Sequence, residues 1–253
     1  MNVKIIAKSV LVISVFLMSF YSKRIVLYFF EVADFENVAN LFLFYSLLIV
    51  PPFLATILLF GLPNSGSSLG LNKGVVKGFW LSVVAVLPMF ISSGLLGKWA
   101  HQLSLLELIK STLLAGFVEE FLFRGFLFGI LFRKLKWGFI PASLLAALIF
   151  GLGHVYQGTS FHQSLAIFII TAMGSMWFAW LYIEWDNNLW IPIFLHTLMN
   201  LSWTLFSVSE NAMGGASVNL FRAITIALTI FYTIRKNKKS GLKISKYNLF
   251  LNS

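Results

Sequence analysis

Long runs of apolar residues alternate with short polar segments along the whole chain. Eight of these runs have close to the roughly 20 residues that a helix needs to cross the hydrocarbon core of a membrane. They cover Ile5–Tyr21, Asn40–Phe60, Gly78–Leu96, Ser111–Phe132, Phe139–Tyr156, Gln163–Glu184, Trp190–Val208 and Ser217–Ile234. The pattern predicts an all-α fold, a polytopic transmembrane helical bundle of about eight transmembrane helices.

The composition excludes a soluble protein. Hydrophobic residues make up 58% of the 253 residues and charged residues only 11%, against roughly 25% charged in an average soluble domain. A soluble fold of this size has no way to hide so much apolar surface from water. The chain contains no cysteine, which excludes disulfides, thiolate metal sites and a cysteine nucleophile. We therefore expect an integral, multi-pass membrane protein with the lipid bilayer as a partner.

The net charge of +10 is better explained by membrane orientation than by nucleic acid. The basic residues do not form a stripe with interleaved aromatics; they lie between the apolar runs. If both termini are cytoplasmic, thirteen Lys and Arg residues fall in inside segments and four in outside loops. This positive-inside bias predicts cytoplasmic termini. No organellar targeting signal is recognisable, so we expect a bacterial plasma membrane.

The chain divides into three parts of a single membrane domain. Residues 1–110 hold the N-terminal helices and their connectors, 111–208 the helices that carry most of the buried polar groups, and 209–253 the last helix and a basic cytoplasmic tail. Segment Gly61–Gly74 is rich in Gly and Ser and is interpreted as a flexible connector. The tail after Arg235 is polar and basic, and we expect it to be loosely ordered.

Ionisable residues at membrane depth are costly and therefore point to function. Glu119 and Glu120 lie within one apolar run, and adjacent positions project about 100° apart on a helix. Arg124 follows Glu120 by four residues, so the two can pair on one face. A buried Glu–Arg pair alone is more often structural. Spacing thus predicts Glu120 and Arg124 as the pair, and Glu119 as a carboxylate left for another partner.

Two further apolar runs contribute the remaining polar residues. His154 follows Phe150-Gly-Leu-Gly, where the small residues allow close helix approach or leave room for a ligand. His196 and Asn200 are spaced i, i+4 and project from one face. Taken singly, His154 is most simply a packing residue, and the other two an interhelical hydrogen-bonding pair. Together with the two glutamates, these residues are hard to explain as packing.

This set of residues fits hydrolysis. A Glu with a His beside it can hold and deprotonate a water molecule. A second His and an Asn can donate hydrogen bonds to the oxygen that becomes negative in a tetrahedral intermediate.

Three blocks of this sequence resemble the signature of the CAAX-protease and bacteriocin-processing (CPBP, or Abi) family of intramembrane proteases. They are Glu119-Glu120-x-x-x-Arg124, Phe150-x-x-x-His154 and His196-x-x-x-Asn200, in that order, each on an apolar run. The segment Asn188-Leu-Trp-Ile-Pro also resembles the one before the third block. The resemblance covers about Ser111–Val208, fewer than half of the residues, and it implies an all-helical bundle that cleaves peptide bonds at or within the membrane.

The resemblance also implies a role for each residue. Glu119 looks like the catalytic carboxylate and His154 like its water-holding partner. His196 and Asn200 resemble the oxyanion-stabilising pair, while Glu120, Arg124 and Phe150 shape the site. If the enzyme depended on a metal, Glu119, His154 and His196 could supply the three ligands that catalytic zinc usually takes. We expect a metal-independent mechanism with no cofactor, and zinc is the alternative.

The leading hypothesis is an intramembrane endopeptidase, glutamate-type or metal-dependent, that acts on a membrane-embedded or membrane-anchored peptide or protein. One alternative is a non-proteolytic member of the same family that confers immunity or acts as a scaffold. The other is a proton-coupled transporter, which would spread polar residues over both halves of the chain, whereas here they crowd into one half.

Overall fold

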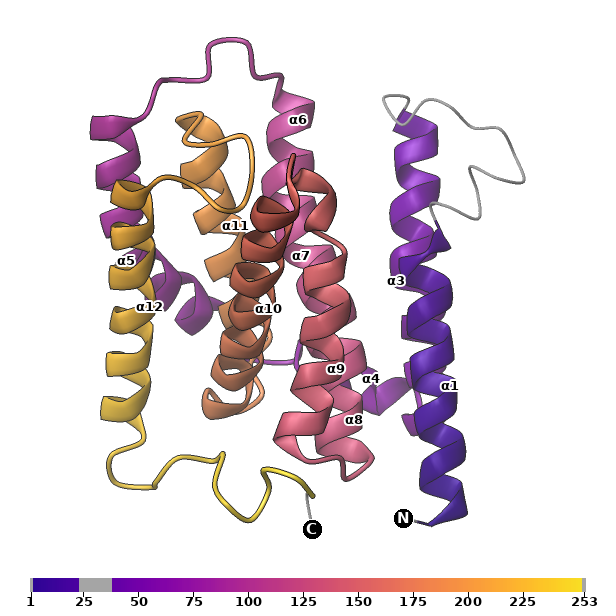
Figure 1. Ribbon diagram of the computed structural model, residues 1–253. Coiled ribbons are helices and arrows are strands. Elements are labelled where there is room, and N and C mark those ends of the chain that lie inside the picture. Colours follow the sequence, from indigo (N-terminus) through magenta and orange to yellow (C-terminus); the bar gives the residue numbers. More distant parts are fainter. Residues whose placement is uncertain (1, 23–37, 252–253) are drawn as a thin grey trace.

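The computed structural model describes residues 2–22 and 38–251, and it is a bundle of helices (Figure 1). Within these residues no β-strand forms; an isolated bridge pairs Trp137 with Leu251. The N-terminal part contains α1 (Val3–Phe20), α3 (Val38–Phe60), α4 (Leu62–Leu69) and α5 (Val75–Leu96). The prediction of an all-α, polytopic membrane bundle is confirmed.

Residues 105–134 form a continuous helical run with two widened stretches. Its parts are α6 (Leu105–Ile109), the π-helical η1 (Lys110–Leu114), α7 (Ala115–Glu120), the π-helical η2 (Phe121–Phe128) and α8 (Gly129–Lys134). The run begins with a capping box, in which Ser104 and Glu107 satisfy each other's backbone N–H groups. π-Helical turns are rare and frequently occur at functional sites. Here η2 starts directly after the two adjacent glutamates.

The rest of the chain contains α9 (Phe139–Leu152), the 3₁₀ turn η3 (Val155–Gln157), α10 (Phe161–Glu184), α11 (Trp190–Leu205) and α12 (Ala216–Lys236). Within the described residues, six segments are long and apolar enough to cross a membrane: Val3–Phe20, Asn40–Phe60, Val75–Leu96, Phe139–Gln157, Phe161–Glu184 and Ala216–Lys236. The chain is therefore an integral membrane protein. The two other predicted crossings are the charged run 105–134 and α11, which has 16 residues, so the count of eight stays a prediction.

The charged run 105–134 passes through the bundle, and its residues 120–132 lie in the interior. In Figure 1, α5 and α12 stand on one side of it, α1 and α3 on the other, and α9 and α10 in front. Its aromatic residues form much of the core, where Phe121, Phe123, Phe126 and Phe128 are almost completely buried. The outer helices instead expose large apolar side chains such as Leu58. The polar groups of the central run are thus enclosed by apolar helices whose outer faces suit lipid.

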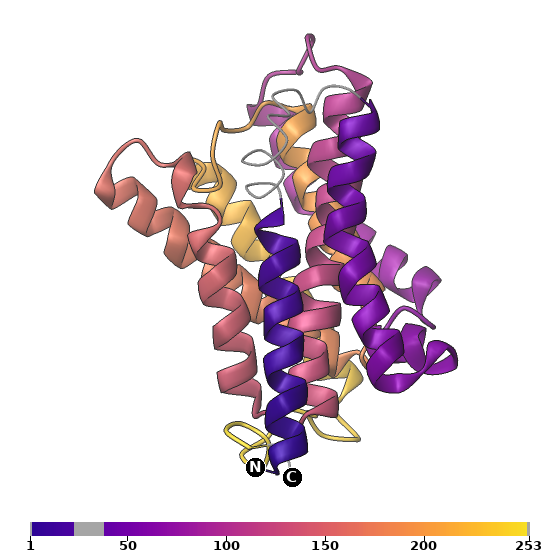
Figure 2. The ribbon, with the colours of Figure 1, turned by 90° about the vertical axis from the view of Figure 1, so that its right-hand side faces the viewer.

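Both chain termini lie at the same end of the bundle in two perpendicular views (Figures 1 and 2). This arrangement agrees with termini on one side of the membrane. That this side is the cytoplasm remains a prediction from loop charge.

The segment Gly61–Gly74 is not the flexible connector that its composition predicts. It contains α4, in which Ser65, Ser68 and Leu69 are buried. The Arg133 guanidinium donates hydrogen bonds to the carbonyl groups of Ser67 and Ser68, at 3.0 and 2.8 Å. These carbonyls lie at the end of α4, where backbone acceptors have no partner within the helix. A distant arginine therefore stabilises a helix that Gly and Ser would not form well alone.

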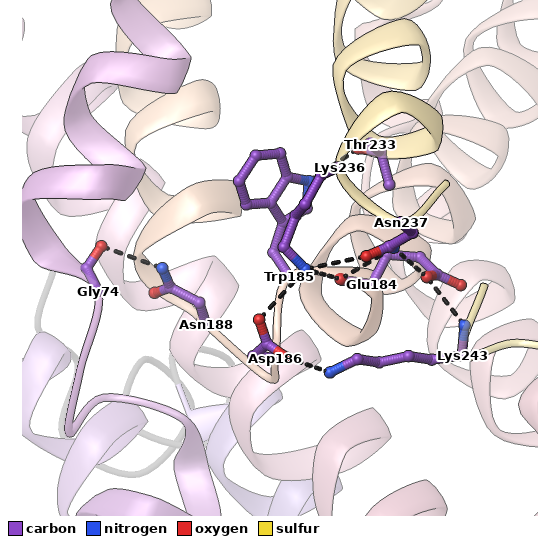
Figure 3. Close-up of polar contacts among 9 residues, drawn as sticks. All are labelled: Gly74, Glu184, Trp185, Asp186, Asn188, Thr233, Lys236, Asn237 and Lys243. Carbon is purple, nitrogen blue, oxygen red and sulfur yellow. Dashed lines mark hydrogen bonds and ion pairs between the residues drawn. The ribbon is translucent and has the colours of Figure 1, made fainter. Parts of the chain in front are cut away.

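The prediction of a loosely ordered tail is also wrong, because a buried glutamate holds it (Figure 3). Glu184, the last residue of α10, is completely buried. Its Oε2 accepts hydrogen bonds from the Asn237 amide at 2.8 Å and from the backbone N–H of Lys243 at 3.0 Å. Its Oε1 accepts from the backbone N–H of Ile244 at 2.9 Å. The tail is thereby fastened to the end of α10.

Two backbone hydrogen bonds and two ion pairs extend this attachment. The N–H groups of Phe139 and Ile140, at the start of α9, each donate at 2.8 Å to tail carbonyls, those of Asn248 and Leu249. Beside Glu184, Asp186 pairs with the ammonium groups of Lys236 and Lys243 (Figure 3). The hydrogen bond from Lys243 is the main reason that the pKa of the Asp186 carboxyl lies below its usual value. The tail thus joins α9, α10 and α12 at the end of the bundle that holds both termini.

Candidate active site

The two adjacent glutamates lie in different environments. Glu120 is completely buried, and its Oε1 pairs with Arg124 Nη1 at 2.9 Å, with Arg124 only 1% exposed. The Glu119 side chain is 34% exposed. The i, i+4 spacing thus gives the expected Glu120–Arg124 pair, and Glu119 is not part of it.

Aromatic rings surround the Arg124 guanidinium. Its central carbon lies 4.6 Å from the ring centroid of Phe150, 5.3 Å from that of Phe178 and 6.0 Å from that of Phe123. Its Nε and Nη2 have no hydrogen-bond partner within the described part of the chain. Cation–π attraction, worth up to about 2 kcal/mol per contact when desolvated, therefore replaces some of the lost hydration. Phe150 contributes to the site by packing on Arg124.

His196 lies between the two carboxylates. Its Nδ1 is 2.8 Å from Glu120 Oε1, and its Nε2 is 3.9 Å from Glu119 Oε2. Because an ionised carboxylate can only accept, Nδ1 carries the hydrogen and donates a hydrogen bond to Glu120. The helix that carries His196 approaches the glutamate helix closely at Gly116, where an added Cβ would overlap Thr197. This close packing of α7 and α11 brings the imidazole within reach of both carboxylates.

Asn200 lies one turn after His196, and its amide already has a partner. Its Nδ2 donates to the Ser111 carbonyl at 2.9 Å. Ser111 belongs to η1, so the bond links α11 to the π-helical turn before the glutamates. The structure brings His196 and Asn200 to one side of the glutamate helix, and their oxyanion-stabilising role stays a prediction.

The start of α11, the helix that carries His196 and Asn200, is also held by side-chain hydrogen bonds. Asn188 donates from Nδ2 to the Gly74 carbonyl at 3.0 Å (Figure 3), and its Oδ1 accepts from the backbone N–H of Trp190 at 3.1 Å. Trp190 is the first residue of α11. The side chain of Asn188 thus fixes the start of this helix against the segment before α5.

His154 follows the end of α9, and its tautomer can be assigned from its contact. Its Nδ1 lies 2.8 Å from the Phe150 carbonyl oxygen. A carbonyl only accepts, so Nδ1 is protonated, and the neutral imidazole keeps an acceptor lone pair on Nε2. The ring also packs on Phe150, with centroids 4.5 Å apart.

The two glycines before His154 serve the two purposes considered above. A Cβ on Gly151 would lie 2.8 Å from the Phe168 ring, so this glycine allows α9 to approach α10. Gly153 instead borders a cavity, across from Phe20.

Glu119 and His154 line one cavity of about 210 Å³. Most of its wall is apolar, and four of its side chains carry polar atoms. The lining residues are Phe20, Phe44, Tyr45, Leu48, Ala115, Val118, Glu119, Leu122, Phe123, Phe150, Gly153, His154 and Tyr156. His196 and Asn200 are not among them. The structure therefore joins the first two predicted catalytic residues in one partly open, largely apolar cavity.

The side chains that could hold a metal do not converge. Within residues 2–22 and 38–251, no group of three His, Asp or Glu side chains is placed to bind one ion. His196 Nδ1 faces Glu120, and His154 Nδ1 faces a carbonyl. Glu119, His154 and His196 thus do not fit a three-ligand zinc site in this arrangement.

Part of the cavity wall comes from α1 and α3, whose sequences carry no functional motif. Phe20 belongs to α1, and Phe44, Tyr45 and Leu48 belong to α3. Residues 44, 45 and 48 share one helical face. In the sequence they look like any other apolar and aromatic residues of a membrane helix, and only the packing of α3 beside α7 identifies them.

Comparison with known proteins relates the central segment to peptidases. Residues 101–202 match the family described as type II CAAX prenyl endopeptidase Rce1-like. A Bacillus subtilis (strain 168) protein named "Putative membrane peptidase YdiL" is 35% identical over 95 residues, which cover 38% of this chain and 34% of that protein. The chain thus spans about a third of the length of this curated relative. The matches confirm the resemblance to the CPBP family, and the segment 101–202 contains every predicted site residue.

Proposed function

From the resemblance of residues 101–202 to the CPBP family, we propose that this protein is an intramembrane endopeptidase. It hydrolyses a peptide bond of a membrane-embedded or membrane-anchored substrate with a water molecule that Glu119 activates. The observation that carries the proposal is the shared cavity, which Glu119 and His154 both line.

The protonation states suit the binding of a water molecule. Ionised Glu119 offers acceptor oxygens, and His154 offers Nε2 as an acceptor because its Nδ1 donates to Phe150. A water molecule between them donates one hydrogen bond to each and keeps a lone pair free for attack. This is the arrangement that general-base catalysis requires.

The reaction then needs no further reactant. Glu119 removes a proton from water as the water oxygen bonds to the carbonyl carbon of the scissile peptide, and the carbonyl π electrons move onto its oxygen. When the tetrahedral intermediate collapses, the C–N bond breaks and the proton passes from Glu119 to the leaving nitrogen. A carboxyl group and an amine are the products.

The contacts of the buried neighbours leave Glu119 available as the general base. Arg124 and His196 Nδ1 both donate hydrogen bonds to Glu120, so these two donors are directed away from Glu119. His196 Nε2 lies 3.9 Å from Glu119 Oε2, which is beyond hydrogen-bond distance, and in a neutral ring with Nδ1 protonated it carries a lone pair and no hydrogen. Glu119 therefore retains the lone pairs that a base needs.

The walls of the cavity indicate an apolar partner. Aromatic and aliphatic side chains from four helices line it, and burial of apolar surface contributes about 25 cal/mol per Å². A substrate segment with a large apolar side chain next to the scissile bond fits such a space. The lipid-facing surroundings suit a substrate that the membrane already holds.

The test compares membranes that contain the wild type or the Glu119→Gln variant. New peptide termini are labelled and identified by mass spectrometry, with Glu210→Gln as control because Glu210 lies on the exposed surface. We expect a set of cleavage products in the wild type and the control that is absent from Glu119→Gln, which should remain folded. Cleavage by stably folded Glu119→Gln would refute the glutamate mechanism. Absence of wild-type products would refute protease activity and favour the scaffold or immunity alternative.

A further inference from the structure

The cavity is lined by two hydroxyl-bearing side chains that the proposed mechanism does not use, those of Tyr45 and Tyr156. Tyr45, on α3, lines it together with Glu119 and His154. It lies outside residues 101–202, the part that matches the peptidase family. Among residues 2–22 and 38–251 its hydroxyl has no hydrogen-bond partner.

The proposed reaction requires a hydrogen-bond donor at this place. Negative charge develops on the carbonyl oxygen when water attacks, and a positioned donor stabilises it. Glu119 and His154 cannot supply this donor, because both act as acceptors toward the water. The N–H groups of Gly153 and His154 already donate to the carbonyls of Ile149 and Gly151.

The other predicted donors do not line the cavity in this arrangement. Asn200 Nδ2 gives one of its two hydrogens to the Ser111 carbonyl, and His196 Nδ1 gives its hydrogen to Glu120. Apart from Glu119 and His154, the polar side chains that line the cavity are Tyr45 and Tyr156. Tyr156 is 80% exposed, so its hydroxyl is at the rim, where water or lipid headgroups compete for it. Tyr45 is half-buried, and a donor is more effective where water is excluded.

We propose that Tyr45 is a catalytic residue that donates its hydroxyl hydrogen to the carbonyl oxygen of the scissile peptide. It faces the cavity from α3, while the base and the water-holding histidine face it from α7 and the end of α9. The substrate carbonyl then lies between two walls, with water on one side and the phenol on the other. This role rests on the proposed protease function, and it gives α3 a part in the reaction.

The experiment uses the full-length protein and a synthetic quenched fluorescent peptide that contains a wild-type cleavage site identified as above. Tyr45→Phe keeps the ring and removes the hydroxyl. Loss of one oxyanion donor typically lowers kcat by about 100-fold or more, so we expect a fall of roughly that size with little change in KM. The thermal midpoint should match that of the wild type. Tyr247→Phe, which removes an exposed hydroxyl in the tail, should retain full activity.

Several results would overturn this role. A Tyr45→Phe variant with the kcat of the wild type would do so. An equally large fall of kcat in Tyr247→Phe would also do so, as would a Tyr156→Phe variant that loses activity while Tyr45→Phe keeps it. An unfolded Tyr45→Phe would show that the hydroxyl serves the fold. If Glu119→Gln is inactive and Tyr45→Phe is active, the catalytic role of Tyr45 is refuted and the proposed protease function stands. If Glu119→Gln is active, the proposed glutamate mechanism itself is refuted.

Discussion

The fully buried Glu120 offers the sharpest test of how the two adjacent carboxylates differ. Its Oε1 accepts from Arg124 at 2.9 Å and lies 2.8 Å from His196 Nδ1. Glu120→Gln preserves the shape and one acceptor oxygen but removes the charge. Loss of one partner of a buried ion pair typically costs about 3–5 kcal/mol, because the other charge stays buried without compensation. Since the Gln oxygen still accepts a hydrogen bond, we expect a loss near the lower end, about 3 kcal/mol.

Unfolding by denaturant in detergent micelles measures this loss, with Glu210→Gln at the surface as the matched control. The double variant Glu120→Gln/Arg124→Met provides an internal check, because Met removes the orphaned charge and still fills space. We expect it to be more stable than Glu120→Gln alone. A Glu120→Gln protein as stable as the wild type would refute the assignment of Glu120 as the buried partner of Arg124.

Two further outcomes are expected. Glu184→Gln should loosen the tail, because the Gln amide replaces one of the two oxygens that accept hydrogen bonds from Lys243 and Ile244 with a donor. Faster hydrogen exchange at Lys243 or Ile244 would show this, and unchanged exchange at both would contradict it. Removal of all metal with a chelator should leave cleavage of the reporter peptide intact, since the described residues place no three ligands together; loss of cleavage that zinc restores would contradict the metal-independent mechanism.

Local features of the fold and site could be predicted from the sequence. An apolar run long enough to cross the membrane is visible residue by residue, and the i, i+4 spacing of Glu120 and Arg124 sets their pairing whatever lies around them. Helical geometry alone also separates Glu119 from that pair. These predictions depend on distances of a few residues along one helix.

The features that the sequence did not reveal depend on residues far apart in the chain. Glu184 looks like a charge at a helix end, and its burial comes from tail residues about 60 positions later. The Gly61–Gly74 segment looks flexible, because the capping Arg133 is about 65 residues away. Composition describes what each segment would do alone. It cannot reveal that a distant donor satisfies the segment's free acceptors.

The position of Arg124 explains why a reactive carboxylate and a structural one can be neighbours in sequence. Two adjacent ionised glutamates in an apolar bundle would repel each other and compete for any cation. Here the buried Arg124 and the Nδ1 hydrogen of His196 are both directed to Glu120, so the stabilising interactions go to one carboxylate. Glu119 is left with the cavity, partial exposure and His196 Nε2 at a distance. The aromatic rings of Phe150 and Phe178 that hold Arg124 in place therefore influence the base indirectly, by keeping the cation on the neighbouring residue.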